Sequence, residues 1–343
     1  MLFKLGVTSQ IDLLFNYISL FALFFSFLVF LSGTFICRSK RNIYNNKLAV
    51  RSLSALLSLT TLFTLLTFTE WGLRIFCPNT WSEASQWRWY ATKVRKNKIG
   101  LRSSEIDINN QSNAKRILIL GDSFAYGFKV DQDKILSSRL EEKLLKRFPA
   151  EVINASFPNW SIVHQKHFFE RLGYALKPDL VVICHVLNDI ESVNPKLKIS
   201  KLYVFLKYNL YLTGLFNPLI SLFSENSAIV DMQSAYTANT IPWNNYFNNL
   251  EVLNSEIKDA NSSLIFLIFP WFSNFNPYPF NEAHNNLKNG LKQMGIESLD
   301  LLDIYKHYPA KDLIVSYRDL HPNSLSHELA AEELYKVIVK HLK

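Results

Sequence analysis

The chain has 343 residues, of which 48% are hydrophobic, and this apolar content is sufficient for a sizeable buried core and excludes a disordered protein. Its formal net charge is +8, but the basic residues are scattered along the chain, so the charge does not indicate nucleic-acid binding. The cleanest basic cluster lies between two apolar runs, a pattern typical of a membrane protein.

Two apolar runs near the N-terminus predict a membrane anchor over residues 1–77. Residues 13–37 form 25 positions without a charge, long enough to cross a hydrocarbon core of about 30 Å as a helix. Residues 52–69 form 18 uncharged positions, eight of them Ser or Thr, and this length is only just sufficient. The alternative for the second run is an interfacial or core helix, which would place the rest of the chain on the opposite side of the membrane.

The charges around these two runs predict the orientation in the membrane. The loop between them is basic, and by the positive-inside rule it faces the cytoplasm, so both ends of the chain face outward. A further basic group at 88–98 argues the other way, although most of it lies near the limit of the rule's range. We therefore expect a multi-pass protein of the cytoplasmic (inner) membrane, in contact with bilayer lipid, whose main domain is extracytoplasmic or periplasmic. The basic residues of the loop are Arg38, Lys40, Arg41, Lys47 and Arg51.

The segment 78–115 is aromatic, then basic, then polar, without a sustained period, and we interpret it as a connector. Its aromatic residues suit either of two places. They could lie at the membrane interface as an aromatic belt, or they could pack against the domain that follows. The residues concerned are Trp81, Trp87, Trp89 and Tyr90.

From residue 116 to 343 the pattern becomes α/β. Short apolar runs alternate with helical stretches, as in a parallel sheet covered on both faces, and predict a three-layer α/β/α domain of flavodoxin-like type. About 75 residues separate the third and fourth runs, more than a crossover requires. We expect an insertion at about 191–245, whose aromatic stretch 201–223 lies beside the site or against the bilayer. The apolar runs are 116–120, 151–155, 179–186 and 263–269.

Polar residues follow the first three of these runs where each strand is expected to end. Because parallel sheets place ligands at the carboxyl ends of their strands, these residues should meet at one edge. They are Asp122 and Ser123, Asn154 and Ser156, and Asn188 and Asp189.

Three motifs carry a resemblance to a known family over roughly residues 112–343. They are "GDSFAYG" at 121–127, the N-D of "VLNDI" at 186–190, and "DLHPNSLSHELAAEEL" at 319–334. Each is unspecific alone, but in this order, at the expected strand ends, they resemble the SGNH hydrolases, also called GDSL-type esterases and acyltransferases, of the membrane-anchored bacterial type.

The resemblance implies serine chemistry that needs no metal and no cofactor. Ser123 would attack an acyl carbonyl, His321 would take its proton and return it to the leaving alcohol, and Asp319 would orient the imidazole. The oxyanion donors implied are the backbone N–H groups of Ser123 and Ser156 and the side-chain amide of Asn188.

Two departures from the family pattern leave alternatives open. The second block, usually N-x-G-x-x-G, reads "NASFPN", with Ser156 and Asn159 in the glycine places. In the last block the common spacing places an aspartate three residues before the histidine, where this chain has Arg318, and Asp319 lies only two before His321. If Asp319 does not reach the imidazole, the serine and histidine could act as a dyad with a backbone carbonyl holding the ring.

The histidines outside these motifs favour structural roles. His164 and His167 have helical spacing but lack carboxylate or cysteine partners, so we expect a packed or solvated helix face rather than a metal site. His327, one turn into the last helix, is expected to pack or to form a local hydrogen bond.

The sequence therefore predicts a serine-dependent acyl-ester hydrolase or O-acyltransferase, and by analogy its substrate is an O-acetylated cell-surface glycan or a related ester. The alternative is a catalytically inactive, membrane-tethered protein of the same fold that binds glycan or acts in assembly. Sequence alone does not fix the acyl group, the acceptor or the oligomeric state.

Overall fold

The computed structural model describes Phe27 and residues 47–76, 93–107, 113–190, 210–212, 232–272, 274–316 and 319–342. The chain divides into two compact units. The first comprises Met1–Thr92 with Lys198–Leu222, and the second comprises Lys93–Leu197 with Phe223–Lys343.

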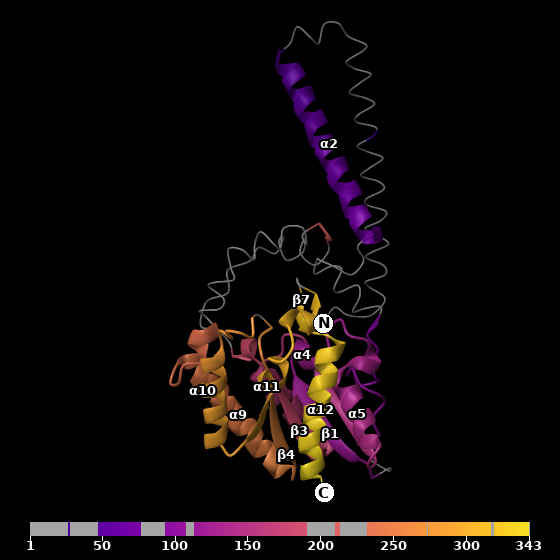
Figure 1. Cartoon of the computed structure of the whole chain (residues 1–343). Helices are drawn as coiled ribbons and strands as arrows, with labels where there is room; N and C mark the ends of the chain where they lie inside the picture. Colours follow the sequence, from indigo (N-terminus) through magenta and orange to yellow (C-terminus); the bar gives the residue numbers. More distant parts are fainter. Residues whose placement is uncertain are drawn as a thin grey trace. The chain divides into compact units, whose positions relative to one another are not determined.

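In the first unit one long helix, α2, runs from Lys47 to Phe76 (Figure 1). Its stretch Ser54–Phe76 has a mean hydropathy of 1.3 and is long and apolar enough to cross a membrane, and only 6% of the apolar window is buried among the described residues. The helix extends beyond the predicted run 52–69 at both ends. Threonine side chains along it donate to carbonyls three or four residues earlier, which satisfies their hydroxyl groups within the helix. The other predicted span, 13–37, lies outside the described residues, apart from Phe27.

A buried ion pair near the end of α2 holds a piece of the predicted insertion. Arg74 Nε lies 2.8 Å from Glu70 Oε1, and both side chains are buried. The Glu70 carboxylate also accepts the backbone N–H groups of Tyr211 and Leu212, at 2.9 and 2.8 Å. Because a buried carboxylate needs this many partners to be stable, the pair fixes residues 210–212 to α2. The rest of the stretch 201–223 lies outside the described residues.

The second unit is built on a five-stranded parallel sheet with the order β2-β1-β3-β4-β5 (Figure 1). This order is the flavodoxin-like arrangement predicted from the sequence, with its topological switch point between β1 and β3. The four predicted apolar runs are confirmed as strands to within one residue at each end. The strands are β1 (Lys115–Gly121), β2 (Ala150–Ser156), β3 (Leu180–Val186), β4 (Ser263–Phe269) and β5 (Glu297–Asp300).

Successive side chains of the sheet point to opposite faces, and each face carries its own core and its own helices. In β1, Ile117 and Ile119 pack on one side, whereas Leu118 and Leu120 pack on the other. Figure 1 shows the two helical layers on either side of the sheet. One layer contains α6 (Ile162–Phe168), α9 (Ile241–Asp259) and α10 (Asn281–Gln293), and the other contains α5 (Leu136–Leu145) and α12 (Ser324–His341). The short helix α11 (Leu302–Tyr305) contributes to both cores.

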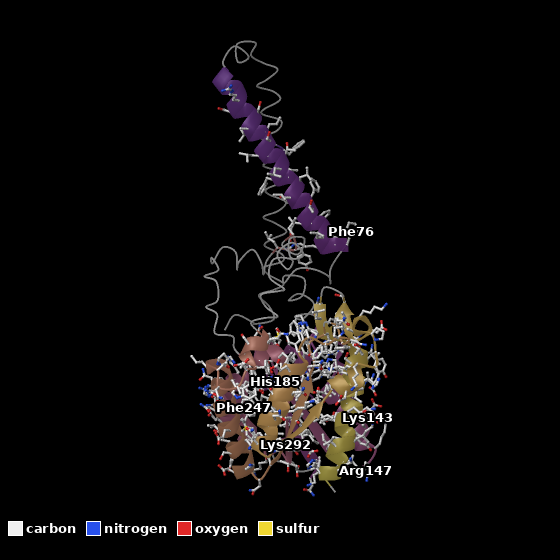
Figure 2. All side chains as sticks on the ribbon, turned by 60° about the vertical axis from the view of Figure 1, so that its left-hand side comes forward. Phe76, Lys143, Arg147, His185, Phe247 and Lys292 are labelled. Carbon is white, nitrogen blue, oxygen red and sulfur yellow. The ribbon has the colours of Figure 1, made fainter. Side chains whose placement is uncertain are left out.

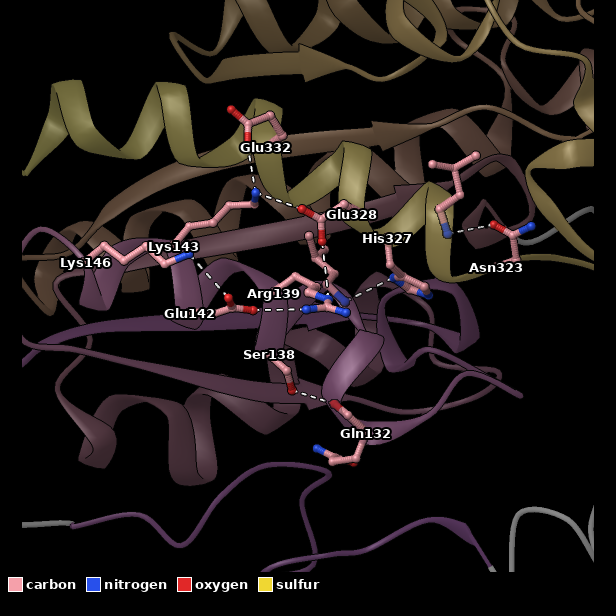
Figure 3. Close-up of polar contacts among 12 residues, drawn as sticks. Gln132, Ser138, Arg139, Glu142, Lys143, Lys146, Asn323, His327, Glu328 and Glu332 are labelled. Carbon is pink, nitrogen blue, oxygen red and sulfur yellow. Dashed lines mark hydrogen bonds and ion pairs between the residues drawn. The ribbon is translucent and has the colours of Figure 1, made fainter.

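Ion pairs join α5 to α12 on the outside of the second layer (Figure 3). Lys143 lies 2.8 Å from both Glu328 and Glu332, and Arg139 lies 3.3 Å from Glu328. These side chains are partly exposed, so the pairs set the register of the two helices more than they stabilise the fold.

Short elements at the C-terminal end of the chain were not predicted. Strand β5 has four residues, "ESLD", without an apolar run. Residues 319–322, expected to open the last helix, form instead strand β7 (Asp319–Pro322), which pairs antiparallel with β6 (Ile314–Ser316). Helix α12 begins only at Ser324, with Asn323 as its N-cap.

Part of the predicted connector belongs to the second unit. Residues 93–107 are grouped with it, and Arg102, almost fully buried, donates to the carbonyls of Tyr126, Gly127 and Val130. The aromatic residues of the connector, at 81–90, lie outside the described residues.

Candidate functional site

Ser123 is the first residue of α4 (Ser123–Tyr126), a short helix that follows β1 directly. The carboxylate of Asp122 caps this helix by accepting the Phe124 N–H at 2.8 Å, which is the turn role expected from the sequence. Burial raises the pKa of Asp122, against the opposing effect of the Phe124 N–H and of His321. The junction places the Ser123 hydroxyl at the carboxyl end of β1, beside the switch point of the sheet.

The two glycines of "GDSFAYG" are required by close contacts. A Cβ on Gly121 would lie 2.7 Å from the Cβ of Ala125 and 3.0 Å from the Cβ of Cys184. Gly127 ends α4 with a left-handed φ of 78°, and a Cβ there would clash with Ile135 Cγ2. This packing holds α4 tightly against the sheet.

Strand β7 carries His321 and Asp319, and it brings the His321 ring to Ser123, which lies much earlier in the sequence. The Nε2 atom of His321 is 2.9 Å from Ser123 Oγ, across 198 positions of sequence. Its Nδ1 atom is 2.5 Å from Asp319 Oδ1, which also accepts the His321 backbone N–H at 3.2 Å. Residues two apart on a strand point to the same side, so a spacing of two suits a strand here.

The proton positions in this triad follow from the partners. An ionised carboxylate only accepts, so His321 Nδ1 carries the hydrogen and Nε2 is free to accept the Ser123 hydroxyl. Burial opposes ionisation of Asp319, but His321 and the ammonium of Lys129 outweigh it and lower its pKa. The Ser123 hydroxyl also lies 3.2 Å from Asp122 Oδ2, a longer contact than the one to the imidazole.

Aromatic side chains flank the His321 ring. The ring centroids of Phe124 and Phe128 lie 5.4 and 5.0 Å from that of His321. Phe124 in turn stacks on Trp271, which follows β4, with centroids 6.4 Å apart. These contacts restrict rotation of the imidazole, and nothing in the sequence pattern marked them.

The last residues of β2 are brought to the same edge but are arranged differently from the expectation. The backbone N–H of Ser156, one of the implied oxyanion donors, donates to Asn154 Oδ1 at 3.1 Å. Asn154 is fully buried and its amide donates to Ala125 O, so it ties the end of β2 to α4. Asn159 lies in the following turn with a left-handed φ of 65°, a conformation that glycine adopts more easily. Asn159 therefore has a backbone conformation that suits the glycine found at this place in the family pattern.

The residues after β3 form a single 3₁₀ turn, Leu187–Asp189. The side chain of Asn188 is exposed, whereas Asp189 is buried and accepts the Val186 N–H at 3.1 Å. Asp189 therefore braces the turn that presents Asn188, as expected from the sequence.

A buried hydrogen-bonded group centred on His185, which Figure 2 labels, supports this turn. Tyr236 donates to Leu187 O at 3.0 Å, so its oxygen accepts from His185 Nε2, 2.6 Å away. His185 Nδ1 then accepts from Tyr246, at 2.8 Å. Burial lowers the pKa of His185 to about 3, which agrees with a neutral ring. The arrangement fixes the backbone just before Asn188, and the sequence carried no signal for it.

Of the other histidines considered in the sequence, His164 and His167 have local partners, whereas the hydrogen-bond partner of His327 is distant in the sequence and not local as expected. His164 Nδ1 accepts the Ser161 N–H at 3.2 Å in a capping box at the start of α6, and His167 lies 2.8 Å from Glu170. His327 is buried on α12, and its Nδ1 accepts the Leu136 N–H at 3.1 Å (Figure 3).

His327 gives a testable pH dependence of stability. Burial, together with the charges of Arg102 and His321, lowers the pKa of His327 to about 3 from an ordinary 6.5. Below pH 6.5 His327 therefore becomes protonated in the unfolded state but stays neutral in the folded state. The free energy of unfolding decreases as the pH falls towards 3. Relative to His327→Gln, the wild type should lose up to about 1.4 kcal/mol of unfolding free energy per pH unit in this window. Melting temperatures of both proteins between pH 7.5 and 5 measure the difference, and a difference independent of pH contradicts the assignment.

Together these residues form a site suited to acyl transfer. A serine hydroxyl is a weak nucleophile near neutral pH, and here an imidazole lies within hydrogen-bond distance to accept its proton. The imidazole is held by a carboxylate at its other nitrogen, which fixes the tautomer that can accept. Among the described residues no group of three or more His, Cys, Asp or Glu side chains is arranged to hold a metal ion.

Comparison with known proteins places the chain among ester-cleaving proteins. The family model described as GDSL-like lipase/acylhydrolase matches residues 119–329, more than half of the chain. No curated protein matches at a significant level.

Three of the solved structures that are similar to this chain have low sequence identity to it. The lipase/acylhydrolase from Enterococcus faecalis is 17% identical, with 65% of this chain and 95% of that chain covered and a TM-score of 0.43. The psychrotrophic esterase EstA from Pseudoalteromonas sp. is 19% identical, with coverages of 66% and 98% and a TM-score of 0.42. A catalytic mutant of Axe2, an acetylxylan esterase from Geobacillus stearothermophilus, is 14% identical, with coverages of 65% and 93% and a TM-score of 0.41.

Proposed function

Because the chain belongs to the GDSL-like lipase/acylhydrolase family, we propose that it is a serine-dependent acyl-ester hydrolase or O-acyltransferase with Ser123, His321 and Asp319 as its catalytic triad. The observation that carries the proposal is the contact of 2.9 Å between Ser123 Oγ and His321 Nε2, which unites two motifs 198 positions apart. The Asp319 carboxylate on the far nitrogen supports the triad over the serine–histidine dyad.

The reaction follows from this geometry. Ser123 Oγ attacks the ester carbonyl while His321 Nε2 takes the hydroxyl proton, and the carbonyl oxygen becomes an oxyanion. Collapse of the tetrahedral intermediate breaks the bond to the alcohol, which leaves with the proton from His321. The acyl group remains on Ser123 until an acceptor, activated by the neutral imidazole, releases it. Water as acceptor completes hydrolysis, and a sugar hydroxyl completes transfer.

The oxyanion needs hydrogen-bond donors at the strand ends. The backbone N–H of Ser123 and the exposed amide of Asn188 are the donors we favour. The N–H of Ser156 can contribute only by leaving Asn154 Oδ1. Asn159, in the second glycine place and in a left-handed conformation, offers another backbone N–H in the same turn.

We base the proposed location and substrate of the protein on its long apolar helix α2, on its sequence and on the family resemblance. One helix long and apolar enough to span a membrane supports attachment to a bilayer. The multi-pass topology, with the catalytic domain on the periplasmic side of the inner membrane, rests on the apolar run 13–37 and on the basic loop after it. An ester carried by a cell-surface glycan, such as an O-acetyl group, is the substrate that fits this placement.

Labelling with a fluorophosphonate probe tests the proposal. The probe reacts with activated serines, so the full-length protein in detergent should be labelled, and Ser123→Ala and His321→Ala should abolish labelling. Circular dichroism and melting temperature show that each variant is folded. A folded wild type that does not label argues for the inactive glycan-binding or assembly protein instead, for which the occupied Ser156 N–H is the favouring observation.

A further inference from the structure

A buried lysine lies against the side of Asp319 that His321 does not use. The ammonium of Lys129 is 3.0 Å from Asp319 Oδ2, and the two side chains are 6% and 4% exposed. An ammonium loses its hydration when buried, and its position is stable only with a close anionic partner. Asp319 therefore fixes the position of the Lys129 ammonium, and Lys129 in turn fixes the position of the Asp319 carboxylate.

The two oxygens of the carboxylate have separate partners. Oδ1 accepts the imidazole N–H and the backbone N–H of His321. Among the described residues Oδ2 has Lys129 as its one partner. Without this ammonium no described group would hold Oδ2, and the orientation of the carboxylate would depend on the two hydrogen bonds to Oδ1 alone.

The backbone around Lys129 is itself held in place. The backbone of Lys129 has a left-handed φ of 60°, which is unusual for a residue other than glycine. The carbonyls of Gly127 and Val130, on either side of it, both accept hydrogen bonds from Arg102, at 2.6 and 2.5 Å. Arg102 also donates to the Gln132 side chain at 3.0 Å. The loop is thus clamped in the conformation that directs Lys129 inward.

We propose that Lys129 is a positioning residue that holds the Asp319 carboxylate in the orientation His321 requires. The inference rests on the proposed function, since it concerns the same triad. It also accounts for how an aspartate two residues before the histidine, rather than at the commoner spacing of three, is kept aimed at the ring.

The ammonium also sets the charge around the imidazole. Among the described residues, the charged or titratable groups that face His321 are Asp319 from β7, Asp122 from the start of α4 and His327 from α12. Lys129 offsets the negative charge of Asp319. Its removal leaves the carboxylate uncompensated, and this favours the protonated imidazole, which cannot accept the Ser123 proton.

The test compares Lys129→Met with Lys129→Arg in the full-length protein, using p-nitrophenyl acetate as the probe ester across pH 5–9. Lys129→Met should lower kcat by about 10- to 100-fold with little change in KM, because misplacement affects the proton transfer rather than binding. The acidic limb of its kcat/KM profile should move to higher pH. Lys129→Arg keeps the charge and should return that limb to its wild-type position.

The outcomes separate this inference from the proposed function. Wild-type protein that is labelled by fluorophosphonate, beside a Lys129→Met variant with wild-type kcat and an unmoved acidic limb, overturns the positioning role alone. A wild type without labelling overturns both. If Lys129→Met does not fold, the double variant Lys129→Met/Asp319→Asn should fold because it removes the uncompensated charge, and a double variant that also fails overturns the pairing.

Discussion

Replacing His321 by alanine is expected to lower kcat for p-nitrophenyl acetate by about 10⁵- to 10⁶-fold. The variant leaves the Ser123 hydroxyl without the base that lies 2.9 Å away, and among the described residues no second imidazole contacts that hydroxyl. Asp122 is the other group near Ser123 Oγ, and its carboxylate is occupied in capping α4. Steady-state hydrolysis by the purified variant, with melting temperature as the check on folding, measures the loss.

Two further variants help to interpret the decrease in kcat that is expected for His321→Ala. His327→Gln changes a buried histidine six positions further along whose Nδ1 accepts the Leu136 N–H, and it should keep kcat within about tenfold of the wild type. Asp319→Asn keeps the shape but favours the wrong tautomer of the imidazole, and should lower kcat by about 10⁴-fold. A His321→Ala variant that retains a tenth of the wild-type kcat is incompatible with a histidine base.

The parts of the fold that could be predicted are those that produce a local pattern. The first four strands are fully or mostly buried on both faces, so they are continuous apolar runs that a sequence reveals. Strand β5 lies at the edge of the sheet and pairs only with β4, and its four residues need no apolar run. The end of α2 was missed because Glu70 and Arg74 interrupt the uncharged run, although their mutual pairing lets the helix continue to Phe76.

The candidate site was predictable as far as parallel topology and family motifs extend. Topology places the residues at the carboxyl ends of β1, β2 and β3 at one edge, and the resemblance supplied His321 and Asp319. The strand that carries these two residues could not be predicted, because β7 is only four residues long and its partner β6 only three. That strand explains why a spacing of two suffices, since both side chains point to the same side.

The supporting contacts of the site had no sequence signal. The carbonyls that Arg102 reaches are 24 to 28 positions away, and Lys129 reaches Asp319 from a distant loop. Such pairs follow neither the helical nor the strand period, and a lone basic residue in a polar loop is expected to be solvated. The same holds for His185 and the two tyrosines bonded to it, Tyr236 and Tyr246, which lie 51 and 61 positions further along the chain.

Replacing Arg102 by methionine is expected to lower the free energy of unfolding by about 3–5 kcal/mol. Arg102 is 1% exposed, and its guanidinium also lies 5.1 Å from the centroid of the Tyr126 ring. Methionine fills much of the space but removes this donor from the buried carbonyls of Tyr126, Gly127 and Val130, of which Gly127 O keeps the Val130 N–H. A buried polar group that loses its partner costs about 1–3 kcal/mol. For a domain of this size each kcal/mol corresponds to about 2–4 °C in melting temperature, so a fall of roughly 6–20 °C should be measurable.

The matched control is Arg139→Met on α5, because Arg139 is a partly exposed arginine that makes surface ion pairs with Glu142 and Glu328. Its loss should cost less than about 1 kcal/mol. If Arg102 holds the loop that directs Lys129 to Asp319, Arg102→Met should also lower kcat at a temperature where the protein is still folded, whereas Arg139→Met should not. A loss of stability with unchanged kcat would restrict Arg102 to folding, and a melting temperature within 2 °C of the wild type would contradict the clamp itself. In the expected case Arg102, in the segment that precedes β1, contributes both to folding and to the order of the Asp319 carboxylate through Lys129.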